Sequence, residues 1–588
     1  MGVFAWLADS WLSGAALADG PLDWLFDNPV LFKPWPWKIF SRDNWNSFTT
    51  FLSIGLALAG AALLLLEQHA KRTGVKVPEQ SARRIGIAFT VIGFLLYFDF
   101  FNPNTRYLQY YHRHELYHYY LGSKYFEEVG YSRLYACTAI AEVELGRGAQ
   151  IRKRRIRDLS AENLIVPTTE TYVFSDPGQC KNHFSDERWE AFKKDVAWFE
   201  RSSRGSYWEG MQEDHGYNPP PVWTMTGKLF ANLAPAGDHF FKLLSLLDIS
   251  LQLGAVLMLN WAFGWRVMAL ATVFWGCNAP ANFYWTGGAF LRQDWIFLFV
   301  SSMCLARKRK FVLSGAALTW SSLLRIFPVL AFTGIGLVML FHLIRHRRLH
   351  RDHQRFIAGC VLAAGLLVPA SIAVTTPTAY QEFIAHIRLH RSTPLTNHMG
   401  LETMVAHDWD GRMVYARDER LSDPFEGWKD GRTERTRAWR PVLIAINLLL
   451  VGWLAWALRR TKLLWVAFAL SVPIICSVLN LTCYYYSIFL APAALALVVP
   501  SIGPAYLALA GASKALLGRF YWIDDRYTAQ SYLFFVFGLC LYYAYSRPFS
   551  LARLRAWWQG KPEPRTPVTP AHEERRDLAA GDASRAGL

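Results

Sequence analysis

Long apolar runs dominate the pattern of hydrophobic and polar positions along the chain. They recur from Thr49 to Tyr545 with roughly 17–22 residues each, which is enough to cross about 30 Å of hydrocarbon as a helix. The pattern predicts an all-α, polytopic membrane protein with about 13 transmembrane helices. The expected spans are 49–66, 85–100, 239–260, 267–285, 294–306, 311–324, 327–344, 356–375, 441–458, 463–480, 485–500, 502–518 and 530–545.

Basic residues gather in short connections between these runs. Clusters at 71–84, 307–310, 345–355, 459–462 and 547–555 all fall on one side of the membrane when the predicted spans alternate in direction. Because Lys and Arg mark cytoplasmic loops, this side is predicted to be cytoplasmic and the N-terminus external. We therefore expect a multi-pass protein of the plasma membrane (the inner membrane of a bacterium).

The polar segments divide the chain into seven regions. In chain order we expect an interfacial N-terminal segment (1–46), the first two transmembrane helices (47–100), a large external loop subdomain (101–237), a central transmembrane bundle (238–375), a second external loop (376–440), a C-terminal transmembrane bundle (441–546) and a basic, largely disordered cytoplasmic tail (547–588).

Charge and cysteine content narrow the classes of function. Lysine and arginine total 62 against 46 acidic residues, a balance that in a soluble protein suggests nucleic-acid binding. Here the basic residues set orientation instead, so no nucleic-acid partner is expected. The eight cysteines include no CxxC pair, and no metal or other cofactor is expected. Cys137 and Cys180, the two in the long polar segment, would be able to pair in an oxidising compartment.

The densest group of chemically active side chains lies in residues 111–130, just after the second predicted span. Glu115, His118 and Gly122 are three or four residues apart and share one helix face. Polar groups beside a membrane span are costly to leave unpaired, so this cluster is a candidate site. The alternative is an interfacial helix whose tyrosines lie at the headgroup level.

The same stretch contains an HExxH pattern from His114 to His118. On a helix this spacing places two imidazoles on one face, with the glutamate as general base, as in zinc peptidases. A third ligand at a fixed downstream spacing is not evident. A membrane zinc peptidase is therefore a less favoured alternative.

A further set of motifs follows in order along the chain. Glu115 and Tyr119 follow the second span, YNPPPVW (217–223) precedes a span, WTGGAFLRQD (285–294) joins two spans, LRIFP (324–328) marks a helix junction, and TNHMGL (396–401) lies in the second external loop. This order resembles the GT-C superfamily of integral-membrane glycosyltransferases, and it covers residues 95–405. It looks most similar to the branch that includes polyprenol-phosphate-mannose-dependent mannosyltransferases.

The resemblance implies a GT-C-like fold and an inverting transfer of a sugar from a polyprenyl-phosphate donor to a lipid or glycan acceptor at the external face. The catalytic base of such enzymes is an acidic residue of the first external loop. That residue here is Glu115 rather than an aspartate, with Asp99 as the second candidate. The family's Gly-Gln pair is divided between Gly288 and Gln293, and its lysine before proline is Arg325.

The reaction needs cations for the leaving phosphate and hydrogen-bonding partners for the sugar. The candidate substrate-binding residues are Arg106, His118, Tyr119, Lys124, Asp214, His215, Tyr217, Arg292, Gln293, Asp294, Arg325, Asn397 and His398. Each arginine has the alternative role of an interfacial residue. A transporter, flippase or scaffold on a similar helical frame is the main alternative function. Its broken helices would lie at the midplane, whereas the polar residues here are in external loops.

Overall fold

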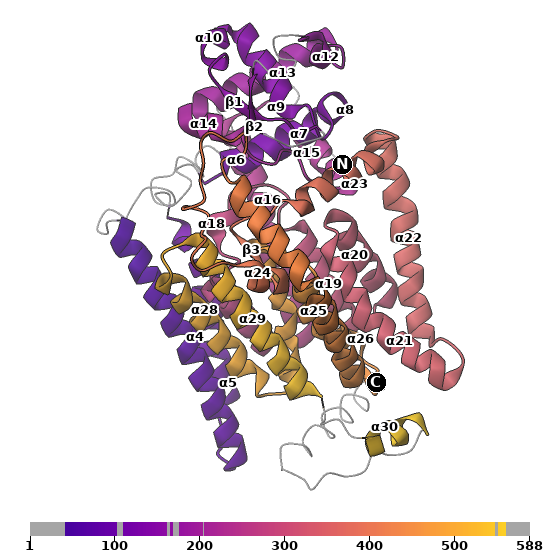
Figure 1. Ribbon diagram of the computed structural model, residues 1–588. Helices are drawn as coiled ribbons and strands as arrows, with labels where there is room; N and C mark the ends of the chain where they lie inside the picture. Colours follow the sequence, from indigo (N-terminus) through magenta and orange to yellow (C-terminus); the bar gives the residue numbers. More distant parts are fainter. Residues whose placement is uncertain are drawn as a thin grey trace, which may run out of the picture.

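The computed structural model describes residues 42–102, 110–160, 165–168, 176–203, 205–546 and 551–559. This part of the chain is mostly helical, with two small two-stranded sheets, so the predicted all-α class is confirmed. A group of short helices covers one end of a bundle of long helices. The turn between α21 (Phe332–His346) and α22 (Arg351–Val374) lies at the opposite end, together with α30 (Leu551–Trp558) (Figure 1).

The first long helices are α4 (Arg42–Arg72) and α5 (Glu79–Tyr97), and a 3₁₀ turn, η2 (Asp99–Phe101), follows. Helix α4 packs against α28 (Ile502–Arg519) from the other end of the chain, as Figure 1 shows. The Gln68 amide reinforces this packing, since it donates a hydrogen bond of 2.9 Å to the Pro500 carbonyl.

The group of short helices corresponds to the predicted external loop subdomain. Its elements are α6 (Arg113–Leu116), the π-helix η3 (Tyr117–Leu121), α7 (Gly122–Lys124), α8 (Phe126–Val129), α9 (Leu134–Glu142), the π-helix η4 (Val143–Arg147), α10 (Gly148–Ile151), β1 (Arg155–Arg157), β2 (Ile165–Pro167), α12 (Gly178–Lys181), α13 (Asp186–Ser202), α14 (Gly205–Met211) and α15 (Pro221–Ala231). Strands β1 and β2 are antiparallel, with Ile156 opposite Val166.

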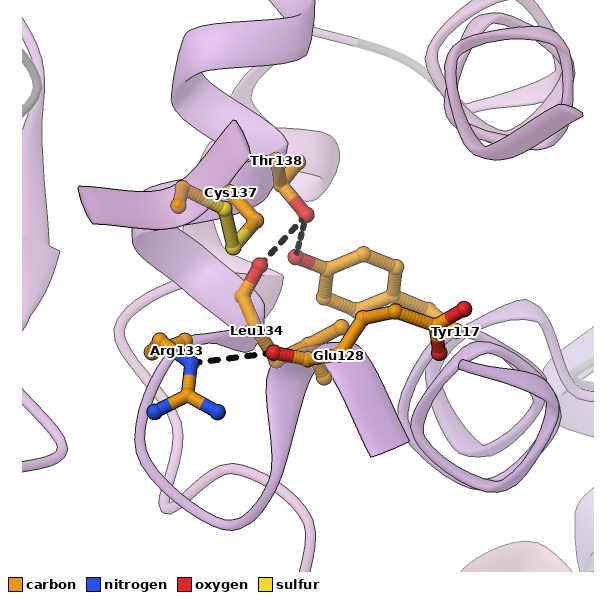
Figure 2. Close-up of a disulfide and its surroundings, with 7 residues drawn as sticks. Tyr117, Glu128, Arg133, Leu134, Cys137 and Thr138 are labelled. Carbon is orange, nitrogen blue, oxygen red and sulfur yellow. Dashed lines mark hydrogen bonds between the residues drawn. A yellow bond between two sulfur atoms is a disulfide. The ribbon is translucent and has the colours of Figure 1, made fainter. Parts of the chain in front are cut away.

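A disulfide between Cys137 and Cys180 ties α9 to α12, which confirms the pairing suggested by the sequence. Beside it, the Tyr117 hydroxyl donates to Thr138 Oγ1, and Thr138 donates to the Leu134 carbonyl (Figure 2). Some buried polar groups in this subdomain pair with one another. Arg154, for example, binds both carboxylate oxygens of Glu142, at 2.6 and 3.1 Å.

The rest of the chain builds the helical bundle and the second polar loop. Its elements are α16 (Asp238–Phe263), α17 (Trp265–Cys277), α18 (Phe283–Thr286), α19 (Asp294–Arg307), α20 (Phe311–Leu324), η6 (Phe327–Ala331), α21 (Phe332–His346), α22 (Arg351–Val374), α23 (Ala379–Ser392), β3 (His398–Met399), α24 (Leu401–Ala406), α25 (Glu426–Leu458), α26 (Leu464–Leu470), α27 (Val472–Val478), β4 (Leu481–Thr482), η7 (Cys483–Leu497), α28, α29 (Ile523–Tyr545) and α30 (Leu551–Trp558).

Five helical segments in the described residues are long and apolar enough to cross a membrane: Asn44–Arg72, Asp238–Phe263, Phe327–His346, Arg351–Val374 and Glu426–Leu458. The expected count of about 13 is not confirmed. Several apolar runs form shorter or broken helices, because prolines and polar turns interrupt them. The run predicted at 267–285, for example, breaks after Cys277 and resumes only at Phe283.

The run predicted at 485–500 is also unusual. It forms the 3₁₀ helix η7, which includes Pro492. A 3₁₀ helix rises about 2.0 Å per residue, so its 15 residues extend about 30 Å, further than an α-helix of that length.

Other boundaries differ from the predicted regions. Helix α25 begins at Glu426 within the predicted second external loop and continues through Pro441. Helix α30 lies in the predicted cytoplasmic tail, where the Trp557 indole donates to the Arg459 carbonyl at 2.7 Å. Residues 1–41 and 560–588, which include most of the predicted interfacial segment (1–46) and the end of the predicted tail, lie outside the described residues, and α4 begins within that segment at Arg42.

Candidate functional site

The beginning of α6 is held against the loop between α18 and α19. The His112 amide donates a 2.7 Å hydrogen bond to the Gly288 carbonyl. Gly288 has a φ of +76°, and a Cβ there would lie 2.8–3.0 Å from backbone atoms of residues 110–112. Only glycine fits this close approach and this backbone conformation. The contact places the HELYH segment beside the loop that carries Arg292.

A carboxylate within α16 holds the same loop through hydrogen bonds to its backbone. Asp248 Oδ1 accepts hydrogen bonds from the backbone amides of Arg292 at 2.9 Å and Gln293 at 3.0 Å. Leu291, the preceding residue, has a φ of +52°, and its carbonyl accepts from the Trp223 indole at 2.7 Å. A non-glycine residue in this region of φ is strained and persists only when its surroundings hold it.

Glu115 and Arg292 form the centre of the site. Arg292 Nε lies 2.9 Å from Glu115 Oε2, an ion pair without the alignment of a hydrogen bond. Arg292 Nη1 donates to the Tyr119 hydroxyl. The Arg292 side chain is 4% exposed, whereas Glu115 is 15% exposed. Three predicted residues, from two separate motifs, therefore meet in one place.

A second arginine, Arg325, lies beside them at the end of α20. Its guanidinium carbon is 6.0 Å from the ring centres of both Tyr119 and Trp223. Arg325 Nη1 donates to the Leu324 carbonyl, and its buried Nη2 has no hydrogen-bond partner among the described residues. An arginine buried with an open donor is a candidate for binding an anion.

Gln293 and Asp294 flank Arg292 and are also buried. The Gln293 amide donates to Thr286 Oγ1 at 3.2 Å, which braces the loop. Asp294 Oδ1 accepts from the Trp295 amide at the first turn of α19, and Oδ2 has no hydrogen-bond partner among the described residues. Asp294 therefore offers an acceptor within this part of the structure.

His118 is held by its neighbours at both ring nitrogens. Nδ1 is 2.7 Å from the His114 carbonyl, and Nε2 is 2.6 Å from the Tyr135 hydroxyl. That hydroxyl already accepts from the Gly216 amide, so it donates its own proton to Nε2 and leaves the proton of the ring on Nδ1. Burial, together with the neighbouring His114, lowers the pKa of His118 to about 4, which agrees with a neutral ring.

His114, His118 and Asp214 form a group with ligand atoms within 4.8 Å of one another. Asp214 is the third residue that the HExxH pattern lacked. The fit to zinc is incomplete, because a metal on His118 would have to displace the Tyr135 hydroxyl from Nε2. Asp214 Oδ2 pairs with His114 Nε2 at 2.8 Å, and Glu115 pairs with Arg292 instead of with this group. We interpret the group as a hydrogen-bonded support for α6.

Other candidate residues lie close to the site in structural roles. Lys124 Nζ binds Asp195 at 2.8 Å in a buried ion pair, and it also donates to the Tyr120 hydroxyl. The Tyr217 hydroxyl donates to Thr224, and its ring packs on Gly122. The ring of His215 lies 5.3 Å from that of His390, and burial lowers its pKa well below the usual value.

The remaining predicted residues are more distant from Glu115. The Asp99 carboxylate accepts from the Trp45 indole at 2.9 Å. No contact joins it to Glu115 or Arg292 among the described residues. His398 pairs in a short sheet with Thr482, and the Asn397 carbonyl accepts from the Cys483 amide. Arg106 lies outside the described residues.

Sequence reasoning missed Asp248 and the pair Tyr484 and Tyr485. Arg292 lies 5.3 Å from the ring centre of Tyr484, and the Tyr485 ring packs 4.6 Å from that of Phe327. Asp248 had a usable signal, since it is an isolated carboxylate inside an apolar run, and such residues mark functional sites. The tyrosines had none, because aromatic residues are common throughout this chain.

Comparison with known proteins found no matching family model, no matching curated protein and no matching solved structure.

Proposed function

We propose that this protein is a membrane glycosyltransferase that transfers a sugar from a polyprenyl-phosphate donor to an acceptor at the membrane surface. The observation that carries the proposal is that Glu115 pairs with the buried Arg292, and that a second buried arginine, Arg325, lies over the ring of Tyr119, to which Arg292 donates. Glu115 and the two arginines come from three separate segments of the chain: α6, the loop before α19, and the end of α20.

The two arginines suit the leaving group. Breaking the bond between the sugar and the carrier lipid leaves negative charge on a phosphate, which buried and fixed cations stabilise strongly. Arg325 Nη2 and Arg292 Nε are buried with no hydrogen-bond partner among the described residues, although Arg292 Nε is ion-paired with Glu115. Arginine also matches the geometry of a phosphate with two parallel donors.

Glu115 suits the role of general base. A carboxylate of the site would take the proton of the acceptor hydroxyl as its oxygen attacks the anomeric carbon, and the phosphate would leave from the opposite face. Glu115 is the more exposed member of the ion pair with Arg292. Tyr119, which is only partly buried and packs edge-to-face against the buried Trp223, provides an aromatic ring against which a sugar can pack.

The test uses purified full-length protein in proteoliposomes with a radiolabelled polyprenyl-phosphate hexose and a pool of lipid acceptors. The wild type should release polyprenyl phosphate and label a product. Glu115→Gln should lower turnover by about 10²–10⁴-fold, the usual cost of losing a general base, while donor binding persists. Glu115→Asp should keep part of the activity, because the shorter carboxylate still accepts a proton.

Asp99→Asn is the matched control, because Asp99 is the second predicted base and has no contact with Arg292 in the described residues. Its activity should stay near that of the wild type. Normal turnover of Glu115→Gln together with inactive Asp99→Asn would move the base to Asp99. Movement of the intact donor across the membrane without release of sugar would instead favour the transporter alternative.

A further inference from the structure

A groove of about 760 Å³ lies between α23, α24 and α25. It is at the end of the bundle that carries the external loop subdomain, because α23 is bound to that subdomain. His386 of α23 lies 2.6 Å from the Asn218 side-chain oxygen, and its ring stacks on Tyr131. The groove is distinct from the Glu115 site, and neither Glu115 nor Arg292 lines it.

The wall of this groove is strongly basic. One carboxylate, Glu402, lines it together with five arginines: Arg388, Arg391, Arg432, Arg437 and Arg440. Burial raises the pKa of Glu402, although Arg391 opposes this shift. None of the five arginines forms an ion pair with a carboxylate in the described residues, and Arg432 is only 4% exposed. Positive charge of this density without a carboxylate partner favours the binding of an anion in the groove.

The arginines continue into an apolar stripe on the same face of α25. Arg432, Thr433, Thr436, Arg437 and Arg440 are followed at helical spacing by Leu443, Ile444, Asn447, Leu448 and Val451, which also line the groove. From Arg440 to Val451 the helix rises about 16 Å. The groove therefore offers a charged head region and an apolar tail region in one line, which is the shape of a lipid.

We propose that this groove binds an anionic phospholipid, with the phosphate held by the arginines of α23 and α25 and the acyl chains laid along the apolar stripe of α25. A role in setting membrane orientation does not account for these arginines. Helix α23, which carries Arg388 and Arg391, lies at the end of the bundle opposite the basic turn between α21 and α22, which marks the predicted cytoplasmic side (Figure 1).

The groove is connected to the candidate site through one short sheet. His398 and Asn480 line the groove, and the Asn480 amide lies 3.2 Å from His398 Nδ1. Asn480 leads into β4, and the chain then reaches Tyr484, whose ring lies beside Arg292. A bound lipid would thus brace the segment that supports Arg292. The binding itself does not depend on the proposed glycosyl transfer.

The test titrates purified full-length protein in detergent with phosphatidylglycerol and measures the bound lipid by native mass spectrometry. The test variant is Arg437→Gln/Arg440→Gln, which changes two exposed arginines and leaves the buried Arg432 in place. The control is Arg345→Gln/Arg348→Gln, two exposed arginines at the opposite end of the bundle. The test variant should bind phosphatidylglycerol roughly 10–30-fold more weakly, and the control should match the wild type.

Phosphatidylcholine, with the same chains but no net charge, should bind the wild type at least about tenfold more weakly. Sodium phosphate at millimolar concentration should not displace phosphatidylglycerol, because it lacks the tails. Equal loss in the test and control variants would overturn the proposal, as would equal binding of the two phospholipids. Displacement by free phosphate, or tighter binding of farnesyl phosphate, would overturn the assignment of the groove to a phospholipid.

Discussion

At the scale of single residues, the hydrogen bonds that hold the candidate site depend on the protonation state of His118. The ring is neutral because Tyr135 donates to Nε2 and the His114 carbonyl accepts from Nδ1. An acid that protonates Nε2 would break the bond from Tyr135. Since Tyr135 also accepts from the Gly216 amide, the loss would reach the segment that carries Asp214.

We predict that His118 makes stability depend on pH below neutrality. Its folded pKa of about 4 lies below the ordinary value of 6.5, so the unfolded chain binds more protons between these values. The contribution is complete above pH 6.5 and is lost as the pH falls toward 4, by about 3 kcal/mol in all. His118→Gln should flatten the fall in melting temperature between pH 7 and pH 5. An unchanged pH profile would contradict this assignment.

Local sequence motifs alone predicted part of the candidate site. Glu115, Arg292 and Arg325 were each expected from local motifs, and the structure brings them together. Lys124 was predicted from its charge to bind substrate, but it forms an ion pair with the buried Asp195. No local pattern encodes that partner, because Asp195 is 71 residues away on α13. Tertiary pairing of this kind decides which charges remain open to a ligand.

At the scale of elements, the contact between Gly288 and the beginning of α6 sets the distance from Glu115 to Arg292. We predict that Gly288→Ala lowers both stability and activity. An alanine would be strained at the positive φ of this position, and its methyl group would clash with the backbone at 110–112. The two effects together should cost about 2–4 kcal/mol of folding free energy.

Gly264→Ala is the matched control for this prediction. Gly264 has a similar φ of +86°, but a Cβ there would meet no atom within 4 Å. It should therefore show the backbone strain without the loss of activity. Thermal unfolding and donor turnover measure the two effects. Equal losses of activity in both variants would show that the contact with α6 does not matter.

The disulfide between α9 and α12 also stabilises the structure at the scale of elements. It closes a loop of 43 residues, which stabilises the subdomain by about 4 kcal/mol through the entropy of the unfolded chain. Cys137→Ser/Cys180→Ser should therefore lower the melting temperature of the protein. Reductant should lower that of the wild type to the same value and leave the variant unchanged. Two alkylatable thiols in the unreduced wild-type subdomain would contradict the bond.

At the scale of the whole molecule, the hydrophobic pattern predicted the helical class. It did not predict the number of spanning helices. Pattern reasoning assumes that one apolar run forms one helix, but Pro473 and residues 278–282 divide two of these runs. It also began α25 too late, because Pro441 lies inside that helix rather than at its start.

The orientation of the bundle is open to a direct test. Basic connections predict that the subdomain is external and the turn between α21 and α22 is cytoplasmic. Glu187→Cys, on the exposed surface of α13, should react with a membrane-impermeant maleimide in intact cells. Arg348→Cys should react only after the membrane is permeabilised. The reverse labelling pattern would invert the topology.

The account as a whole depends on where the donor binds. The most direct measurement is a cryo-EM map of the full-length protein with a non-hydrolysable polyprenyl-phosphate sugar. We predict phosphate density within hydrogen-bond distance of Arg292 and Arg325, with the sugar beside Tyr119 and Glu115 facing the anomeric carbon. A donor phosphate bound away from both arginines, or a metal ion held by His114 and His118, would contradict the proposed function.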